Sequence, residues 1–229
     1  MDIPVAWKQY SVEFISTFAL IFIGAGAVVA DARYGNVGLV GIALAHGLVL
    51  MAMIYATAHI SGAHVNPAVT FAMWVTKRID TVKGIGYIIS QLLGAAAAGF
   101  ALKFIYQNNG LVAHLGTPAL APGISPVLGI ATEALLTFLL VFTIFGTAVD
   151  KKGSSHHAGL AIGLVLAFDI LMGGNLTGAA MNPARAFGPM VAANYWQNHL
   201  VYWIGPLLGA AVAGLLYQYI FLQKPKVRK

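Results

Sequence analysis

The sequence has no cysteine and very few charged residues. Cysteine is absent from all 229 positions, which excludes disulfide bonds, thiol chemistry and thiolate metal sites. Only 9% of the residues are charged, and the seven acidic residues are scattered along the chain. The sequence pattern shows neither a nucleophile paired with a base nor a group of metal ligands. We therefore expect no enzyme, no cofactor and no metal site.

Apolar residues, in contrast, are abundant. Hydrophobic residues make up 59% of the chain and the mean hydropathy is +0.80, which is typical of a polytopic membrane protein. The length allows about six to eight spans of roughly 20 residues with short loops. We interpret the first apolar block, residues 14–30, as a retained span rather than a signal peptide. The net charge of +6 does not indicate a nucleic-acid partner, because the basic residues lie at the ends of the predicted spans. The expected partner is the lipid bilayer.

Two uncharged runs are longer than a single span requires. One covers the 43 residues between Arg33 and Lys77, and the other extends from Ala186 to Gln223. A helix of about ten residues rises roughly 15 Å, which is half of the hydrocarbon core. The expected fold is therefore all-α, with six transmembrane helices and two re-entrant half-helices. The full spans are expected at about 10–30, 38–58, 83–106, 127–148, 157–176 and 199–222, and the half-helices at about 66–76 and 182–192.

The surplus in each run lies beside the same tripeptide. It occurs as Asn66-Pro67-Ala68 and again as Asn182-Pro183-Ala184. Asn is a preferred N-cap and Pro is preferred at the first helical position, so each copy predicts a helix start. An ordinary capping turn at a surface accounts for one such motif. Two uncharged copies at membrane depth indicate a pore.

The two halves of the chain resemble each other. Glu13-x3-Thr17-Phe18 recurs with Glu133 at an offset of 120, the asparagines recur at 116, and Tyr87 recurs as Tyr202 at 115. We expect one channel domain over 1–229, with repeat 1 at about 8–108, repeat 2 at about 125–223 and an outer connecting loop at about 109–124. Each half contains three full spans, an odd number, so the second half is expected to be inverted.

The distribution of Lys and Arg predicts the orientation. If both termini are cytoplasmic, only Arg33 and Lys103 fall on the outer side and Arg185 lies within the membrane. This orientation agrees with the positive-inside rule, and we therefore expect both termini in the cytoplasm. The remaining basic residues are then cytoplasmic: Lys8, Lys77, Arg78, Lys83, Lys151, Lys152, Lys224, Lys226, Arg228 and Lys229.

These motifs resemble the aquaporin (major intrinsic protein) superfamily over essentially the whole chain. The resemblance rests on the paired tripeptides together with Glu13, Glu133, His64, Arg185 and Tyr202-Trp203. It implies a homotetramer in which each subunit has its own pore. Such a pore passes water and small neutral solutes passively and excludes protons and ions.

The resemblance also implies an outer constriction, or selectivity filter, formed by His46, Ile170, Ala179 and Arg185. Strict water channels of the family usually have an aromatic residue at the first position and His at the second. The combination found here resembles the tonoplast aquaporins, some of which also pass ammonia. Two ordinary alternatives stay open: His46 could be an interhelical histidine, and Arg185 could extend to the membrane interface.

Glu13 and Glu133 are expected to hold the re-entrant loops, with Gln91 assisting. The resemblance implies that this support frees backbone carbonyls to line the pore, from Gly62, Ala63, His64, Gly178, Ala179 and Ala180. A proton relay through the two glutamates is a weaker alternative, because there is one in each half rather than a chain of acidic groups.

Other function classes make different predictions. A glycerol facilitator is the main alternative, although such relatives usually carry Asp where this chain has Ala186. A secondary transporter would need an ion site, and no acidic cluster accompanies the broken helices. An adhesive or structural membrane protein would have a closed pore. Asp169 receives no clear role, and His114 is either an additional filter group or an ordinary loop histidine.

Overall fold

The computed structural model describes residues 4–222, with backbone alone for 108–112. Gln223 and the basic residues expected on the cytoplasmic side at 224, 226, 228 and 229 lie outside this range. The helices, in chain order, are α1 (Val5–Tyr34), α2 (Gly38–Ser61), α3 (Pro67–Val75), α4 (Thr81–Tyr106), η1 (Gln107–Gly116), α5 (Pro126–Ile144), η2 (Phe145–Val149), η3 (Ser155–His157), α6 (Ala158–Thr177), α7 (Pro183–Ala193), α8 (Val201–Leu216) and η4 (Tyr217–Phe221).

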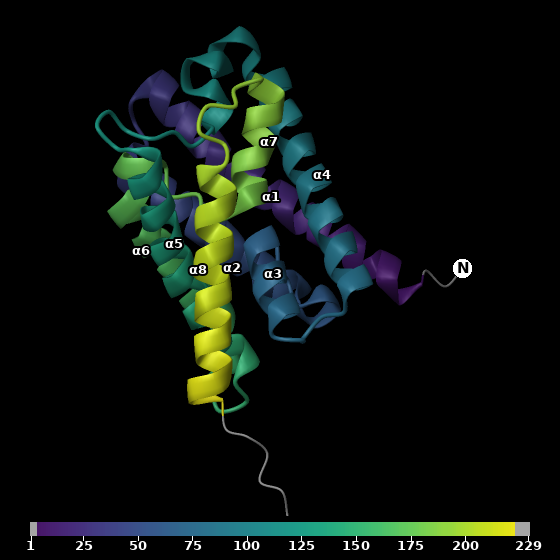
Figure 1. Ribbon diagram of the computed structural model, residues 1–229. Helices are drawn as coiled ribbons and strands as arrows, with labels where there is room; N and C mark the ends of the chain where they lie inside the picture. The colour runs from purple at the N-terminus through teal and green to yellow at the C-terminus, as the bar shows by residue number, and fades with distance from the viewer. Residues whose placement is uncertain (1–3, 223–229) are drawn as a thin grey trace, which may run out of the picture.

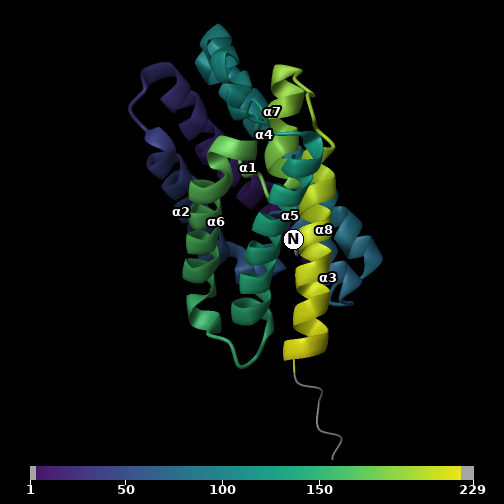
Figure 2. The same cartoon turned by 60° about the vertical axis from the view of Figure 1, so that its left-hand side comes forward.

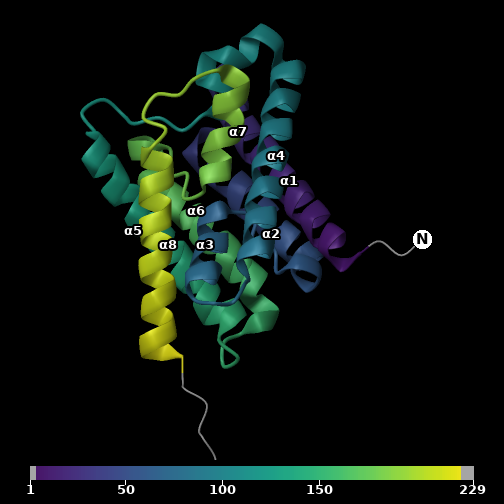
Figure 3. The ribbon, with the colours of Figure 1, turned by 45° about the vertical axis from the view of Figure 1, so that its right-hand side comes forward.

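Six long helices form the body of the molecule (Figure 1). Within residues 4–222, six helices are long and apolar enough to cross a membrane. They pack as pairs, α1 with α4, α5 with α8 and α2 with α6; Figure 2 shows the last two pairs side by side, and Figure 3 shows α1 beside α4. The predicted all-α membrane architecture is confirmed.

The two short helices lie one above the other, with α7 in the upper half of Figure 1 and α3 in the lower half. Each begins at the predicted asparagine. The side-chain oxygen of Asn66 accepts from the Ala68 N–H at 2.8 Å, and that of Asn182 accepts from the Ala184 N–H at 2.9 Å. The proline that follows each asparagine occupies the first helical turn. The two helices contact each other.

Some helix ends differ from the sequence expectation. α1 extends from Val5 to Tyr34, beyond the expected 10–30, and ends where Gly35 adopts a left-handed φ of 66°. The expected outer loop also begins within a 3-10 helix, η1, that continues directly from α4. Hydropathy identifies the part of a helix that crosses the hydrocarbon core, but it does not report how far the helix extends into the polar interface.

Close packing between the long helices depends on glycine. A Cβ at Gly94 in α4 would lie 2.3 Å from the backbone oxygen of Phe14 in α1. Between α4 and α7, a Cβ at Gly99 would lie 2.4 Å from the Gly188 oxygen, and a Cβ at Gly188 would lie 2.2 Å from the Ala95 oxygen. Small residues let membrane helices approach closely, and here they hold α7 against α4.

We predict that Gly94→Ala destabilises the protein by about 1–3 kcal/mol, because the methyl group would meet backbone that cannot move aside. Gly84→Ala, on the same helix, is the matched control: its Cβ would meet the nearest atoms at 3.8 Å, so the better helix propensity of alanine should leave stability unchanged or slightly higher. Thermal unfolding in detergent compares the two variants, and equal midpoints would contradict the packing argument.

Candidate functional site: a central pore

Two loops leave the helical conformation in the middle of the bundle. α2 ends at Gly62 with φ 91°, and α6 ends at Gly178 with φ 85°. Positive φ angles then recur at matching positions: Ala63 (50°), Val65 (55°), Ala179 (43°) and Met181 (52°). A left-handed conformation is unfavourable for residues other than glycine, by about 1–2 kcal/mol each. Both loops must therefore be held by their surroundings.

Glu13 holds the first loop. Its side chain is completely buried, and it accepts hydrogen bonds from four groups. One carboxylate oxygen accepts from the Ser61 hydroxyl at 2.7 Å and the His64 N–H at 2.9 Å. The other accepts from the Val65 N–H at 2.7 Å and the Gln91 amide at 2.8 Å. A single carboxylate thus satisfies two consecutive backbone N–H groups that no helix can pair.

Glu133 holds the second loop in the same way. It accepts from the Thr177 hydroxyl at 2.6 Å, the Ala180 N–H at 2.9 Å and the Met181 N–H at 2.7 Å. The assisting glutamine of the first half has no counterpart here, because Pro206 occupies the corresponding position.

Each asparagine also bonds to the opposite loop. The Asn66 amide donates to the Met181 carbonyl at 2.9 Å, and the Asn182 amide donates to the Val65 carbonyl at 3.0 Å. The sequence analysis did not identify Val65 or Met181. Each of these two residues directly precedes a motif asparagine, and this position in the sequence could have identified it.

Two buried tyrosines complete the loop supports and were also missed as site residues. The Tyr87 hydroxyl donates to the Ser61 carbonyl at 2.7 Å, and the Tyr202 hydroxyl donates to the Thr177 carbonyl at 2.8 Å. These bonds occupy the last carbonyl of α2 and of α6. The internal repeat aligns the two tyrosines, and this alignment could have identified them as a matching pair.

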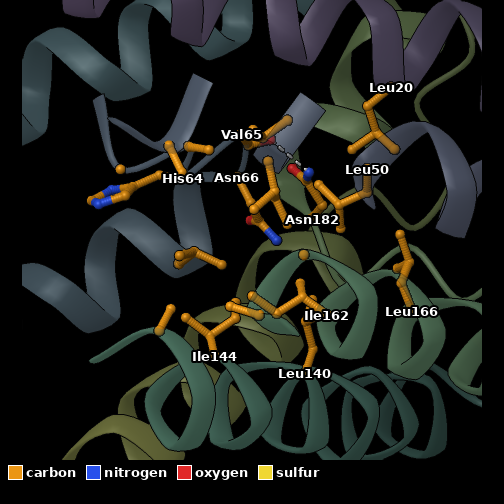
Figure 4. A pocket seen from close by; sticks show the side chains of 18 of the residues that line it. Leu20, Leu50, His64, Val65, Asn66, Leu140, Ile144, Ile162, Leu166 and Asn182 are labelled. Atoms are coloured by element: carbon orange, nitrogen blue, oxygen red, sulfur yellow. Dashed lines mark hydrogen bonds between the residues drawn. The ribbon is translucent and has the colours of Figure 1, made fainter. Parts of the chain in front are cut away.

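Both asparagines line a cavity of about 470 Å³ (Figure 4). Aliphatic side chains from the surrounding helices line it opposite the two loops: Leu20, Leu50, Ile54, Leu140, Ile144, Ile162 and Leu166. Five of the six residues expected to supply carbonyls also line it, namely Gly62, Ala63, His64, Ala179 and Ala180. Gly178 is not among its lining residues, and instead packs against Pro118. The cavity therefore has one polar wall and one apolar wall.

The four predicted filter residues all line this cavity. The His46 ring is buried, with Nδ1 2.9 Å from the Ile42 carbonyl, and it packs so closely on Gly24 that a Cβ there would lie 2.4 Å from the ring. Arg185 is also buried, and its Nη1 donates to the Gly116 carbonyl at 2.7 Å. The Arg185 guanidinium thus lies buried inside the bundle.

The two residues without a clear role lie away from the cavity lining. Asp169 is buried beside Ile170, and its Oδ2 has no hydrogen-bond partner among the described residues. His114 is exposed and stacks on Tyr195, with ring centroids 3.9 Å apart. Within the described residues no cluster of three or more His, Cys, Asp or Glu could hold a metal ion.

A family model described as "Major intrinsic protein" matches residues 2–217. The chain belongs to the major intrinsic protein family. It is 44% identical to Aquaporin TIP2-1 of Arabidopsis thaliana over 223 residues, which cover 94% of this chain and 88% of that protein. It is 43% identical to Probable aquaporin TIP3-2 of the same plant, covering 96% and 85%. These relatives confirm the resemblance to tonoplast-type aquaporins.

The fold of this family member is also similar to a solved structure. The X-ray structure of the aquaglyceroporin from Plasmodium falciparum superimposes with a TM-score of 0.82 at 26% identity. The match covers 94% of this chain and 96% of that one. The six spans and two half-helices of this chain thus follow the architecture of the family.

We predict that Glu13→Gln lowers both stability and water flux. Either orientation of the new amide sets an NH2 group against a backbone donor, the N–H of His64 or of Val65. The cost should be about 1–3 kcal/mol, the range for a buried donor left without an acceptor. Thermal unfolding and vesicle shrinkage report the two effects.

The control for this variant is Asp80→Asn, the same carboxylate-to-amide change at an exposed N-cap. Asp80 accepts from the Lys83 N–H at 3.0 Å, and asparagine caps equally well. If Glu13→Gln behaves like this control, the buried carboxylate does not support the loop.

Proposed function

We propose that the chain is a passive channel that conducts water, and also ammonia, through the cavity between its two half-helices, and that it excludes protons and ions. The observation that carries this proposal is the pair of asparagine amides. Asn66 and Asn182 come from opposite halves of the chain and line one cavity together (Figure 4).

The bonding of the amides supports proton exclusion. Each NH2 group has two hydrogens, and the carbonyl of the opposite loop accepts one of them. The second hydrogen is left for a water molecule in the cavity. A water that accepts from both Asn66 and Asn182 directs its own hydrogens away from the centre, toward the two ends of the file. A continuous chain of proton transfer cannot pass through such a water.

The helix ends add an electrostatic barrier. α3 and α7 both begin at the cavity, at Asn66 and Asn182, and the N-terminus of a helix carries roughly half a positive charge. Two such ends together repel cations, hydronium included. The loop carbonyls on the polar wall act as acceptors for a file of water molecules, whereas the aliphatic wall leaves each molecule few partners and lets it move on.

His46, Ile170, Ala179 and Arg185 form the selectivity filter of this channel. Arg185 donates hydrogen bonds to passing solute and repels cations. Ile170 and Ala179 take little room and offer no hydrogen bonds, which leaves the passage wider and less polar than a filter with a second ring. Such a filter admits ammonia together with water.

A glycerol facilitator is the second candidate. The likeness to an aquaglyceroporin structure and the small aliphatic side of the filter favour it. Ala186, in place of the Asp usual for glycerol-type relatives, argues against it. Water conduction with low glycerol flux distinguishes the two functions.

We further propose that the protein is a homotetramer with both termini in the cytoplasm. The family resemblance supports the assembly, and the basic residues at one side support the orientation. The chain itself is an integral multi-pass membrane protein. No nucleic-acid partner is proposed.

We predict that proteoliposomes containing the protein shrink severalfold faster than empty vesicles in a stopped-flow osmotic step. Mercurial reagents should not change the rate, because the chain has no cysteine. Shrinkage no faster than that of empty vesicles would indicate a closed structural protein. Saturable flux that depends on sodium or protons would indicate a transporter.

We predict that Ile170→His lowers ammonia permeability by about tenfold, an added barrier of roughly 1.4 kcal/mol, while water permeability changes less. The added ring narrows the filter and introduces a second polar side. Ile170→Val keeps a branched aliphatic residue and is the matched control. Ammonia uptake followed with a pH dye in the same vesicles measures both variants, and an unchanged ratio of ammonia to water would contradict the proposed filter.

A further inference from the structure

The short turn that joins α3 to α4 lies in the lower half of Figure 1 and carries two basic residues. α3 ends at Val75, and the membrane span that contains α4 begins at Thr81. Lys77 and Arg78 lie between these two points, and both side chains are exposed. Basic residues directly beside a membrane span are attracted to anionic lipid headgroups. The position of this pair therefore indicates an anionic partner.

Lys77 occupies a backbone position that favours glycine. Its φ is 58°, in the left-handed region. Its N–H donates to the Trp74 carbonyl at 2.9 Å, and the Arg78 N–H donates to the Met73 carbonyl at 2.8 Å. These are the two bonds of a Schellman motif, in which glycine is the usual left-handed residue. A lysine at this position is unfavourable for the backbone, and such strain is concentrated at sites where the side chain is used.

A surface cavity of about 420 Å³ opens at this turn. We call it the α3–α4 cavity, and it is lined by Trp74, Lys77, Arg78, Ile79, Asp80 and Thr81. The one acidic group among these residues is already engaged, because an Asp80 carboxylate oxygen caps α4 by accepting from the Lys83 N–H at 3.0 Å. The Trp74 indole donates to the Thr81 hydroxyl at 3.0 Å, and tryptophan is typical of the membrane interface. Two cations against one capped carboxylate suit a small anionic group such as a phosphate.

An apolar face of α4 begins directly beside this cavity. Val82, Ile85, Ile89 and Leu93 are spaced by three or four residues, so they lie on one side of the helix, and each is at least half exposed. A phospholipid joins a phosphate to long acyl chains, so it can occupy the α3–α4 cavity and this face at the same time. A free phosphate would use the cavity alone.

We propose that the α3–α4 cavity binds the headgroup of an anionic phospholipid. Lys77 and Arg78 contact the phosphate, and the acyl chains lie along the exposed apolar face of α4. Among the described residues, this cavity and the central cavity have no lining residue in common. The inference therefore does not depend on the proposed channel function.

The test compares two lipids with the same acyl chains in thermal unfolding of the protein in a neutral detergent. Phosphatidylglycerol is anionic and should raise the unfolding midpoint at a lower concentration than phosphatidylcholine, which has no net charge. Lys77→Gly should weaken the apparent affinity for phosphatidylglycerol by about fivefold, the effect of one basic residue near a membrane surface. Without added lipid, the same variant should unfold at an equal or higher temperature, because glycine fits the left-handed position. A lysine with a purely structural role would not give this pair of results.

Lys151→Gly is the matched control, because it makes the same substitution at the same end of the bundle. Lys151 is exposed and follows η2, whose first residue, Phe145, has its ring 5.6 Å from the Arg78 guanidinium. This control should keep the affinity of the unmodified protein. Lys77→Arg, which retains the charge, should keep it as well. Should Lys77→Gly fail to fold, Arg78→Gln applies the same test to the second cation.

Three results would overturn the proposal: unchanged affinity in Lys77→Gly, an equal loss in Lys151→Gly, or equal affinity for the two lipids. If inorganic phosphate alone raises the midpoint as much as phosphatidylglycerol does, the cavity holds a free anion and the lipid assignment is wrong. None of these measurements uses flux. Their failure would leave the proposed channel function intact, and a closed pore in the osmotic experiment would leave the lipid site intact.

Discussion

The structure depends on two buried carboxylates that satisfy backbone where no helix can. A chain that stops being helical in mid-bilayer exposes N–H groups that lipid cannot pair, and each unpaired group costs several kcal/mol. Glu13 and Glu133 remove that cost by accepting two consecutive backbone N–H groups each. With the donors turned toward the carboxylates, the carbonyls of the same peptides are free to face the cavity. A pore wall and its support therefore come from the same loop.

The carboxylates alone would leave two separate half-helices. The asparagine amides join them, because each amide caps its own helix with its oxygen and donates to the opposite loop with its nitrogen. The acceptors, Val65 and Met181, also donate their N–H groups to the glutamates. A displacement of either loop would consequently disturb a cap, a cross-bond and a carboxylate at once. This coupling explains how the two loops can hold residues with unfavourable φ angles.

The sequence predicted the parts of this site that local physics determines. Charge-free runs located the spans, and the Asn-Pro pairs located the half-helix starts, because capping and the missing proline N–H are properties of adjacent residues. The acceptors of the asparagine amides could not be predicted in this way: Val65 and Met181 are ordinary apolar residues, and their partners are 117 and 115 residues away. The pore-lining role of the Gly178 carbonyl stays a prediction, since Gly178 packs against Pro118 and is not among the residues that line the cavity.

The internal repeat makes the two halves of the fold similar, and the proposed filter breaks that symmetry. At an offset of 116 residues, the position of Arg185 corresponds to Val69 and that of His46 to Ile162. Both counterparts are apolar, and both line the same cavity on the opposite half. The proposed proton exclusion needs symmetry at the centre, because it requires two equal helix ends and two amides acting on one water. Away from the centre, a second buried arginine would add another desolvation cost without adding a further partner. A single buried arginine in two otherwise similar halves is therefore the arrangement that buries the fewest charged side chains.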